Sequence, residues 1–313
     1  MSEGTVDEKV SIIIPTYNRA QLLRECLVSL LGMQGVEENV EIVVVDNGST
    51  DETRHIVSSF ALRHRGVVYV EEVRSGLSQA RNRGVKVASG GIVAFLDDDV
   101  EVHQSWLGAL RQAFRNPRIS AVGGRVLPPM GVNLPSWMPT SRMYLLSLFD
   151  NGDTPRRYTQ RECFPGGNMA LRKWLFVSCG LFDTSLGRKR RILLGGEEVA
   201  LYRKIVRGGY EVWYWPDMIV YHKIADRIDP DWILNYASCL GRSDLRMDLL
   251  YGNKWKCLAK SVRSVTQIFG SGLRGKPMVL SQRHFEQSIR RHYAKGYLQE
   301  LRTILDLRVW RFR

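Results

Sequence analysis

The chain has 313 residues, of which 44% are hydrophobic and 25% charged, so it is long enough to bury a sizeable core and its composition excludes a disordered or fibrous protein. Its formal charge of +13 indicates an anionic partner, which is a nucleic acid, an anionic lipid surface or a phosphorylated substrate. Charge alone does not choose among these three.

The five cysteines are widely spaced and include no CxxC pair, and we expect no secretory leader before them. This pattern argues against a disulfide framework or a zinc site and is typical of a reducing cytoplasm. No run approaches the roughly 18 to 20 consecutive apolar residues of a membrane-spanning helix. We therefore expect a cytoplasmic protein that does not span a bilayer, with peripheral contact at the inner face of the membrane as a further hypothesis.

Short apolar runs alternate with amphipathic segments through the first part of the chain. The expected strands are Val10 to Pro15, Val40 to Val45, Gly66 to Val70 and Gly91 to Leu96. The expected helices are Ala20 to Leu31, a segment capped by Ser49 or Thr50, Leu77 to Ala88 and Trp106 to Phe114. This alternation predicts an α/β fold with an open, mostly parallel sheet flanked by helices, whose ligands bind at the carboxyl ends of the strands.

The rest of the chain is less regular. A long proline-containing connection leads to a helix at Val199 to Val206 and to strands at Tyr210 to Trp215 and Ile219 to His222, where the predicted sheet ends. The remaining sequence is rich in Arg, Lys and aromatic residues, with helices expected at Pro230 to Leu240, Trp255 to Phe269 and His284 to Leu305. We therefore expect a sheet domain over residues 1–225 and a basic helical region over residues 226–313.

Three consecutive aspartates, Asp97, Asp98 and Asp99, follow the fourth apolar run. Like charges at close range repel each other unless a cation or hydrogen bonds compensate them. A divalent ion such as Mg²⁺ or Mn²⁺, when only one or two carboxylates hold it, takes its other ligands from water and substrate phosphates. The cluster therefore predicts a metal site with a diphosphate ligand. The alternative is a solvated acidic turn that caps the following helix.

Six segments resemble, in order, the motifs of family 2 glycosyltransferases with the GT-A fold: VSIIIPTYNRA, EIVVVDNGSTDET, GLSQARNRG, AFLDDDVEV, FPGGNMALRK and LGGEEVALYRKIVRGGYEVWYWPDMIVYH. Several motifs in the right order are far more specific than any single one. The resemblance implies a catalytic domain that transfers a sugar, with inversion, from a nucleotide-diphosphate donor to a hydroxyl of a glycan or lipid-linked acceptor in polysaccharide or glycoconjugate biosynthesis. UDP is the nucleotide by family habit, with GDP and dTDP as alternatives.

The resemblance also assigns roles to residues at the strand ends. Pro15, Thr16, Tyr17 and Asp46 would form the nucleoside pocket, with Asp46 accepting a hydrogen bond from the base. The alternative for Asp46 is a turn with a helix cap. Arg81 would reach the nucleotide, since a guanidinium can clamp phosphate or base edges with several donors. A salt bridge from Arg81 to the aspartate cluster is the alternative.

For the metal, the resemblance implies Asp99 as a ligand, with Asp97 and Asp98 contacting the ribose or the donor sugar. His222 matches a histidine that completes the metal site in some relatives, whereas a histidine at a strand end otherwise has a structural role. The expected cofactor is a divalent ion, Mn²⁺ or Mg²⁺.

Glu197 and Glu198 stand where the family carries its acidic catalytic pair, and transfer with inversion needs a base for the acceptor proton. The common family pattern is Glu-Asp, so the second glutamate departs from it and the choice of base between the two stays open. Two glutamates at a helix N-terminus are the structural alternative. Gly167 and Asn168 belong to a segment that the family places near the donor sugar and the acceptor.

The basic C-terminal region interleaves cations with aromatic residues, a composition suited to an anionic interface, so we consider peripheral membrane contact there, with a solvated charged helical face as the alternative. Two other functions are possible for the whole chain. A metal-dependent nucleotidyltransferase usually has a glycine-rich signature where this chain has PTYNRA. A nonenzymatic module that binds nucleic acid or membrane would suit the charge, but the common nucleic-acid motifs are absent from the sequence, so no nucleic-acid partner is expected.

Overall fold

The computed structural model describes residues 8–36, 39–160, 162–190, 192–252, 254–269 and 281–310. In this part of the chain a nine-stranded mixed sheet has the order β3-β2-β1-β4-β8-β6-β9-β5, and β7 pairs with β9. The strands are β1 Val10–Thr16, β2 Val40–Asp46, β3 Val67–Glu71, β4 Ile92–Leu96, β5 Val100–Val102, β6 Ile119–Leu127, β7 Arg156–Arg157, β8 Asn168–Arg172 and β9 Glu211–His222.

The strands from β3 to β4 are parallel and correspond to the four strands expected in the first part of the chain. This confirms the predicted α/β fold. Beyond β4 the sheet changes direction, because β8 is antiparallel to both β4 and β6. Strands β5, β6, β7 and β8 were not expected from the sequence, and the two strands expected between Tyr210 and His222 form one continuous strand. Two glycines explain why β6 is hard to recognise in the sequence. A Cβ on Gly123 or Gly124 would lie 2.5 Å or less from neighbouring atoms, so the close packing of those neighbours requires glycine where a strand usually has a larger side chain.

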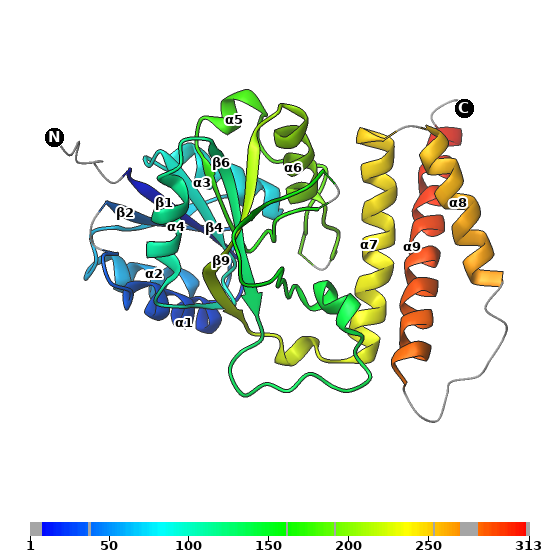
Figure 1. The fold of residues 1–313 in the computed structure, drawn as a ribbon, viewed down its shortest axis with the longest axis horizontal. Coiled ribbons are helices and arrows are strands. Elements are labelled where there is room, and N and C mark those ends of the chain that lie inside the picture. Colours follow the sequence, from blue (N-terminus) through cyan, green and yellow to red (C-terminus); the bar gives the residue numbers. More distant parts are fainter. Residues whose placement is uncertain are drawn as a thin grey trace. The chain divides into compact units, whose positions relative to one another are not determined.

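Helices cover both faces of the sheet (Figure 1). They are α1 Ala20–Leu31, α2 Thr53–Ala61, α3 Leu77–Val87, α4 Trp106–Phe114, α5 Leu175–Ser178 and α6 Glu197–Arg207. Apolar residues of α1, α2 and α4 pack with Ile12 and Ile14 of β1, whereas those of α3, α5 and α6 pack with the core that contains Ile13. A strand that is buried on both faces needs apolar residues throughout, which is why its sequence reads as a continuous run.

The chain divides into two compact units. The first contains the sheet and comprises Met1–Met130, Leu148–Thr184 and Glu197–Lys223, and the second comprises Gly131–Ser147, Ser185–Gly196 and Ile224–Arg313. The second unit therefore includes two segments from the middle of the sequence in addition to the C-terminal region. Its helices are η1 Thr140–Leu146, η2 Ala225–Arg227, α7 Pro230–Tyr251, α8 Lys254–Phe269 and α9 Gln282–Trp310. No helix in the described ranges is long and apolar enough to cross a membrane.

Helix α7 continues past the end expected at Leu240, although Gly241 follows. A Cβ at Gly241 would lie 2.0 Å from the Tyr293 carbonyl oxygen, and one at Gly296 would lie 1.9 Å from the Ser238 carbonyl oxygen. The two glycines therefore allow α7 and α9 to approach each other closely, and Gly241 serves helix packing rather than helix termination.

The contact between α3 and β1 gives a test of this packing. A Cβ at Gly84 would lie 2.4 Å from Ile13 Cγ2, so we expect Gly84→Ala to lower the free energy of unfolding by about 1–3 kcal/mol through overpacking. At the exposed Gly108 of α4, an added Cβ meets nothing within 4 Å, so Gly108→Ala should raise the free energy of unfolding by about 0.5–1 kcal/mol. Urea unfolding curves measure both values. Equal effects of the two substitutions would contradict a close contact at Gly84.

Candidate active site

The carboxyl ends of β1, β2 and β4 meet at one edge of the sheet. Thr16 at the end of β1 pairs with Asp46 at the end of β2, and β4 lies on the other side of β1. The strand order reverses at β1, and in open α/β sheets such a reversal leaves a crevice that binds ligands. The topology therefore brings the polar residues that follow these strands to the same place.

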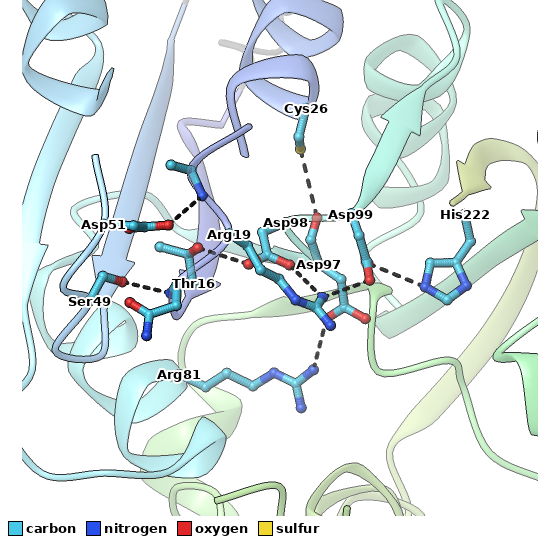
Figure 2. A network of polar contacts seen from close by, with 12 residues as sticks. Thr16, Arg19, Cys26, Ser49, Asp51, Arg81, Asp97, Asp98, Asp99 and His222 are labelled. Atoms are coloured by element: carbon cyan, nitrogen blue, oxygen red, sulfur yellow. Dashed lines mark hydrogen bonds and ion pairs between the residues drawn. The ribbon is translucent and has the colours of Figure 1, made fainter. Parts of the chain in front are cut away.

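The three aspartates that follow β4 lie at this edge of the sheet (Figure 2). Asp98 and Asp99 are buried, whereas the Asp97 side chain is 34% exposed. Thr16 Oγ1 donates a hydrogen bond of 2.8 Å to Asp98. Arg19 Nη1 lies 3.1 Å from an Asp98 oxygen and 2.7 Å from an Asp99 oxygen, so one guanidinium bridges two carboxylates. Sequence reasoning missed Arg19, although its signal was a basic residue in the loop that directly follows β1.

The cluster carries unfavourable negative charge in spite of Arg19. Burial, and then the charge of Asp99, raise the pKa of Asp98 to about 6, while Arg19 and the hydrogen bond from Thr16 act in the opposite direction. Burial and the same aspartates raise the pKa of the Cys26 thiol, which donates a hydrogen bond to the Asp97 carbonyl oxygen. A bound cation would relieve this excess of negative charge.

His222 is brought to the cluster by the pairing of β5 with β9. The register aligns Val100 with His222, directly after Asp99 in the chain. The His222 side chain is 1% exposed, and its Nε2 lies 3.2 Å from Asp99 Oδ1 (Figure 2). The two expected metal ligands thus lie next to each other.

Asp99 and His222 fit a divalent ion by donor type, because a carboxylate and an imidazole are both ligands of Mn²⁺. Among the described residues, no group of three or more His, Cys, Asp or Glu side chains is placed to hold an ion. A donor set of two residues fits an ion that takes its remaining ligands from water and a diphosphate.

Asp46 forms the turn that the sequence analysis considered as an alternative to base binding. Its Oδ1 accepts a hydrogen bond of 2.8 Å from the Ser49 N–H, and its Oδ2 accepts one of 2.9 Å from the Tyr69 hydroxyl. Each carboxylate oxygen has a further lone pair, so this turn is compatible with an additional donor from a ligand. At the neighbouring strand end, Pro15 is buried and Tyr17 is 36% exposed.

The loops after β1 and β2 are tied together by direct hydrogen bonds. The Asn18 N–H donates to Ser49 Oγ at 2.9 Å, and Asn18 Oδ1 accepts from the Thr50 N–H at 2.7 Å. Asp51 accepts from the Ala20 N–H at 2.9 Å and from the Thr53 N–H at 3.1 Å, so it serves the N-termini of both α1 and α2 (Figure 2). The expected cap at Ser49 or Thr50 was wrong, because α2 begins later, at Thr53.

Arg81 of α3 is buried and joins three segments. Its Nη1 donates to Glu197 Oε1 at 2.7 Å, and its Nη2 donates to the Gly166 carbonyl oxygen at 2.9 Å. The same Nη2 lies 3.6 Å from Asp97 Oδ1. The salt bridge to the aspartate cluster, which was the alternative to nucleotide contact, is therefore present, and the shorter one to Glu197 was not foreseen.

Glu197 and Glu198 form the first turn of α6. Glu197 is buried, and one of its oxygens is paired with Arg81. Glu198 is partly buried as a residue, but its Oε2 is buried and has no hydrogen-bond partner. Burial, and then the charge of Glu197, raise the pKa of Glu198 to about 8, while Arg81 opposes the shift. A carboxyl group with this pKa can exchange a proton near neutral pH, as a general base must.

The Gly166-Gly167-Asn168 segment lies against the side chains of Asp97 and Arg81. A Cβ at Gly167 would lie 2.4 Å from Asp97 Oδ2, and one at Gly166 would lie 3.2 Å from Arg81 Nη2, so both positions need glycine or local rearrangement. Asn168 is fully buried: its Oδ1 accepts from Trp106 Nε1 at 2.8 Å, and its Nδ2 donates to two carbonyl oxygens. In this structure the Asn168 side chain joins α4, β6 and β9, and the backbone at Gly167 is the part of the segment next to Asp97.

Comparison with known proteins identifies the family. A model of glycosyl transferase family 2 matches residues 11–177, which is more than half of the chain. The chain belongs to glycosyl transferase family 2. A glucosyl-dolichyl phosphate glucuronosyltransferase from Haloferax volcanii is 28% identical over 248 residues, which cover 78% of each chain. The family match shows that the chain is a glycosyltransferase, and it displaces the alternatives of a nucleotidyltransferase and a nonenzymatic module.

Solved structures show the GT-A fold for this family 2 chain. A mannosyltransferase from Pyrobaculum calidifontis, in complex with GDP-Man and Mn²⁺, matches with a TM-score of 0.58 at 22% identity and covers 94% of this chain and 75% of that one. GalNAc-T7 with UDP, GalNAc and Mn²⁺ matches with a TM-score of 0.60 at 19% identity, and the match covers 95% of this chain but 56% of that one. At 22% and 19% sequence identity, this structural similarity shows the fold alone.

The raised pKa of Glu198 predicts how stability depends on pH. Between the ordinary pKa of 4.5 and the folded value of about 8, the unfolded chain releases a proton that the folded chain keeps, so stability falls as pH rises through this window. Glu198→Gln stays neutral and should remove this part of the decline. Thermal melts from about pH 5 to pH 9 measure it.

The matched control is Glu162, whose pKa is lowered where that of Glu198 is raised. Arg156, 2.5 Å from Glu162, lowers the pKa of that carboxyl to about 2, so the stabilisation is present throughout the same pH range. Glu162→Gln should therefore lower the melting temperature at every pH tested. The same pH slope in Glu198→Gln and in the unchanged protein would contradict the assignment of the raised pKa to Glu198.

Proposed function

We propose that this glycosyltransferase transfers a sugar, with inversion at the anomeric carbon, from a UDP-sugar to a hydroxyl of a glycan or lipid-linked acceptor in polysaccharide or glycoconjugate biosynthesis. The observation that carries the proposal is the position of Arg81, whose guanidinium contacts both Asp97 after β4 and Glu197 at the start of α6. One buried cation thereby links the aspartate cluster, where the donor would bind, to the glutamate pair, where the acceptor would be activated.

The donor side would be formed by the loops after β1, β2 and β4. Pro15, Thr16, Tyr17 and Asp46 would hold the nucleoside, and the hydrogen bonds between the two loops keep this wall fixed before a ligand arrives. Asp97 and Asp98 would contact the ribose or the donor sugar. A preformed wall favours binding because less conformational entropy is lost when the ligand binds.

Asp99 and His222 would hold a divalent ion, Mn²⁺ or Mg²⁺, which supplies positive charge to the leaving diphosphate when it is bound. Arg81 would add its own charge on the side that faces Asp97. To contact the diphosphate, Arg81 need give up only one of its present contacts. Its guanidinium has five N–H donors, so it can bind a phosphate oxygen and still keep a bond to the protein.

The base would be Glu198, with Glu197 as the alternative. Each glutamate has one buried oxygen without a hydrogen-bond partner. Glu198 is favoured because the other oxygen of Glu197 is paired with Arg81 and because the pKa of Glu198 is raised to about 8. The acceptor oxygen attacks the anomeric carbon while its proton passes to the Glu198 carboxylate. The bond from the anomeric carbon to the diphosphate oxygen breaks, and its electron pair leaves with the diphosphate. A single in-line displacement inverts the configuration and needs no covalent intermediate.

The names of similar proteins support a lipid-linked acceptor and a nucleotide-sugar donor. By its name, the Haloferax volcanii relative acts on a glucosyl-dolichyl phosphate, which favours a lipid-linked acceptor here. The two solved structures contain GDP-Man or UDP together with Mn²⁺, which supports a nucleotide donor and a divalent ion. We favour UDP over GDP and dTDP on the resemblance of the motifs to the family.

Calorimetric titration of UDP, GDP and dTDP, in Mn²⁺ and in EDTA, tests the donor site. We expect UDP to bind in Mn²⁺ and not in EDTA, and to bind at least about tenfold more weakly to Asp99→Ala, because a ligand to the ion is lost. Asp153→Ala is the matched control, since Asp153 is 93% exposed and pairs with Arg125 outside the cluster. Absence of binding for every nucleotide in both conditions would overturn the donor site.

The pH dependence of transfer tests the base. The base must be ionised, so kcat/KM should rise with pH through the pKa of Glu198, about 8 in the free protein. Glu198→Gln should lower kcat/KM by about 10²–10⁴-fold. Glu197→Gln should shift the rise to lower pH, because removal of a neighbouring negative charge lowers the pKa of Glu198. The reverse pattern in the two variants would assign the base to Glu197.

A further inference from the structure

Helix α8 of the second unit turns polar residues toward its neighbours. Lys260 Nζ lies 2.7 Å from Asp248 and 3.3 Å from Asp244, both on α7, and it stands over the Tyr297 ring of α9. Ser264 is 4% exposed, and Cys257 packs with Leu245 and Tyr297 in the small core of the three helices. The side chains that α8 turns toward the other two helices thus include a paired lysine, a serine and a cysteine, none of them a large apolar residue.

The outward face of α8 carries large apolar residues. Trp255 is 78% exposed, Leu258 55%, Val262 56% and Val265 42%. Steps of three, four and three residues place these four side chains on one side of the helix, which we name the α8 stripe. Leu249 and Leu250, at the end of α7 just before α8, are also exposed. Single exposed apolar residues are ordinary, but a continuous stripe opposite a polar inward face is typical of an interaction surface.

The charge of the surrounding sequence indicates what covers this stripe. Residues 254–313 contain 14 lysines and arginines and three acidic residues, so this stretch carries +11 of the formal charge of +13. Arg263 of α8 is exposed, next in sequence to Val262 of the stripe. A second copy of the chain would bring two strongly basic segments together, which is unfavourable. An anionic lipid surface satisfies both features, because acyl chains accept the apolar side chains and headgroups accept the cations.

We infer that the second unit docks on an anionic lipid bilayer through the α8 stripe, with Trp255 and its apolar neighbours entering the boundary between headgroups and acyl chains. The inference goes beyond sugar transfer and does not depend on it, since this contact needs neither donor nor metal. It gives a structural reason for an enzyme that acts on a lipid-linked acceptor to remain at the surface where that acceptor is found.

Co-sedimentation of the full chain with vesicles tests the inference. We expect binding to vesicles of phosphatidylcholine mixed with phosphatidylglycerol and much weaker binding to phosphatidylcholine alone. Replacing Trp255, Leu258 and Val262 together with serine should weaken binding to the anionic vesicles at least about tenfold, because the apolar part of the contact is lost. The single variant Trp255→Ser should weaken it in the same direction and serves if the triple variant does not fold, as judged by circular dichroism.

The matched control is Leu62→Ser combined with Val177→Ser. These side chains are 90% and 89% exposed in the first unit, so the variant removes exposed apolar surface outside the stripe and should bind vesicles as the unchanged protein does. Three results would each overturn the inference: no binding to anionic vesicles, equal binding by the stripe variants and the unchanged chain, or equal weakening by the control. Conversion of a dimer to a monomer by Trp255→Ser in gel filtration would also overturn it, by showing that a second copy covers the stripe.

Discussion

The repulsion among the three carboxylates of Asp97, Asp98 and Asp99 is the constraint on which the site depends. Two of them are buried at the end of β4, where separation from water strengthens their repulsion. Arg19 from the loop after β1 and Arg81 from α3 supply compensating positive charge, and the His222 ring from β9 lies against Asp99. Burial, and then the charge of Asp99, still raise the pKa of Asp98, so added positive charge at this place would favour its ionised form.

The same balance of charges connects the two halves of the proposed reaction. Arg81 contacts Asp97 on one side and Glu197 on the other, and the glycines at 166 and 167 allow the chain to pass close to Arg81 and Asp97. Glu198 lies beside this pair without a partner for its buried oxygen. Because Arg81 contacts both Asp97 and Glu197, any change in its contacts when a donor binds would also change the charge that acts on the glutamates. In the second unit, helix α8 has the ion pairs of Lys260 with α7 on one side and exposed apolar residues on the other.

Local sequence patterns predicted the elements that are defined by local periodicity. The bounds of α1 and α4 agree residue for residue, and the parallel strands β1 to β4 were found because strands buried on both faces read as apolar runs. The pattern also placed Asp46 and the aspartates at strand ends, and hence near each other. It did not give β5 or β8, which are short and antiparallel, and so it did not give the reason for the contact between His222 and Asp99. Arg19 and the pair of Arg81 with Glu197 were missed because such contacts join residues that are far apart in sequence and depend on the finished topology.

The most direct test is a crystal structure of the chain with UDP and Mn²⁺, with the ion located by anomalous scattering at the manganese edge. We expect one manganese peak bound by Asp99 and His222, with diphosphate oxygens completing its ligands and the nucleoside between the loops after β1 and β2. The Arg81 guanidinium should face the diphosphate while Glu198 stays free of the ion. A manganese peak on Glu197 and Glu198, with Asp99 and His222 uncoordinated, would contradict the assignment of donor and acceptor sides on which the account is built.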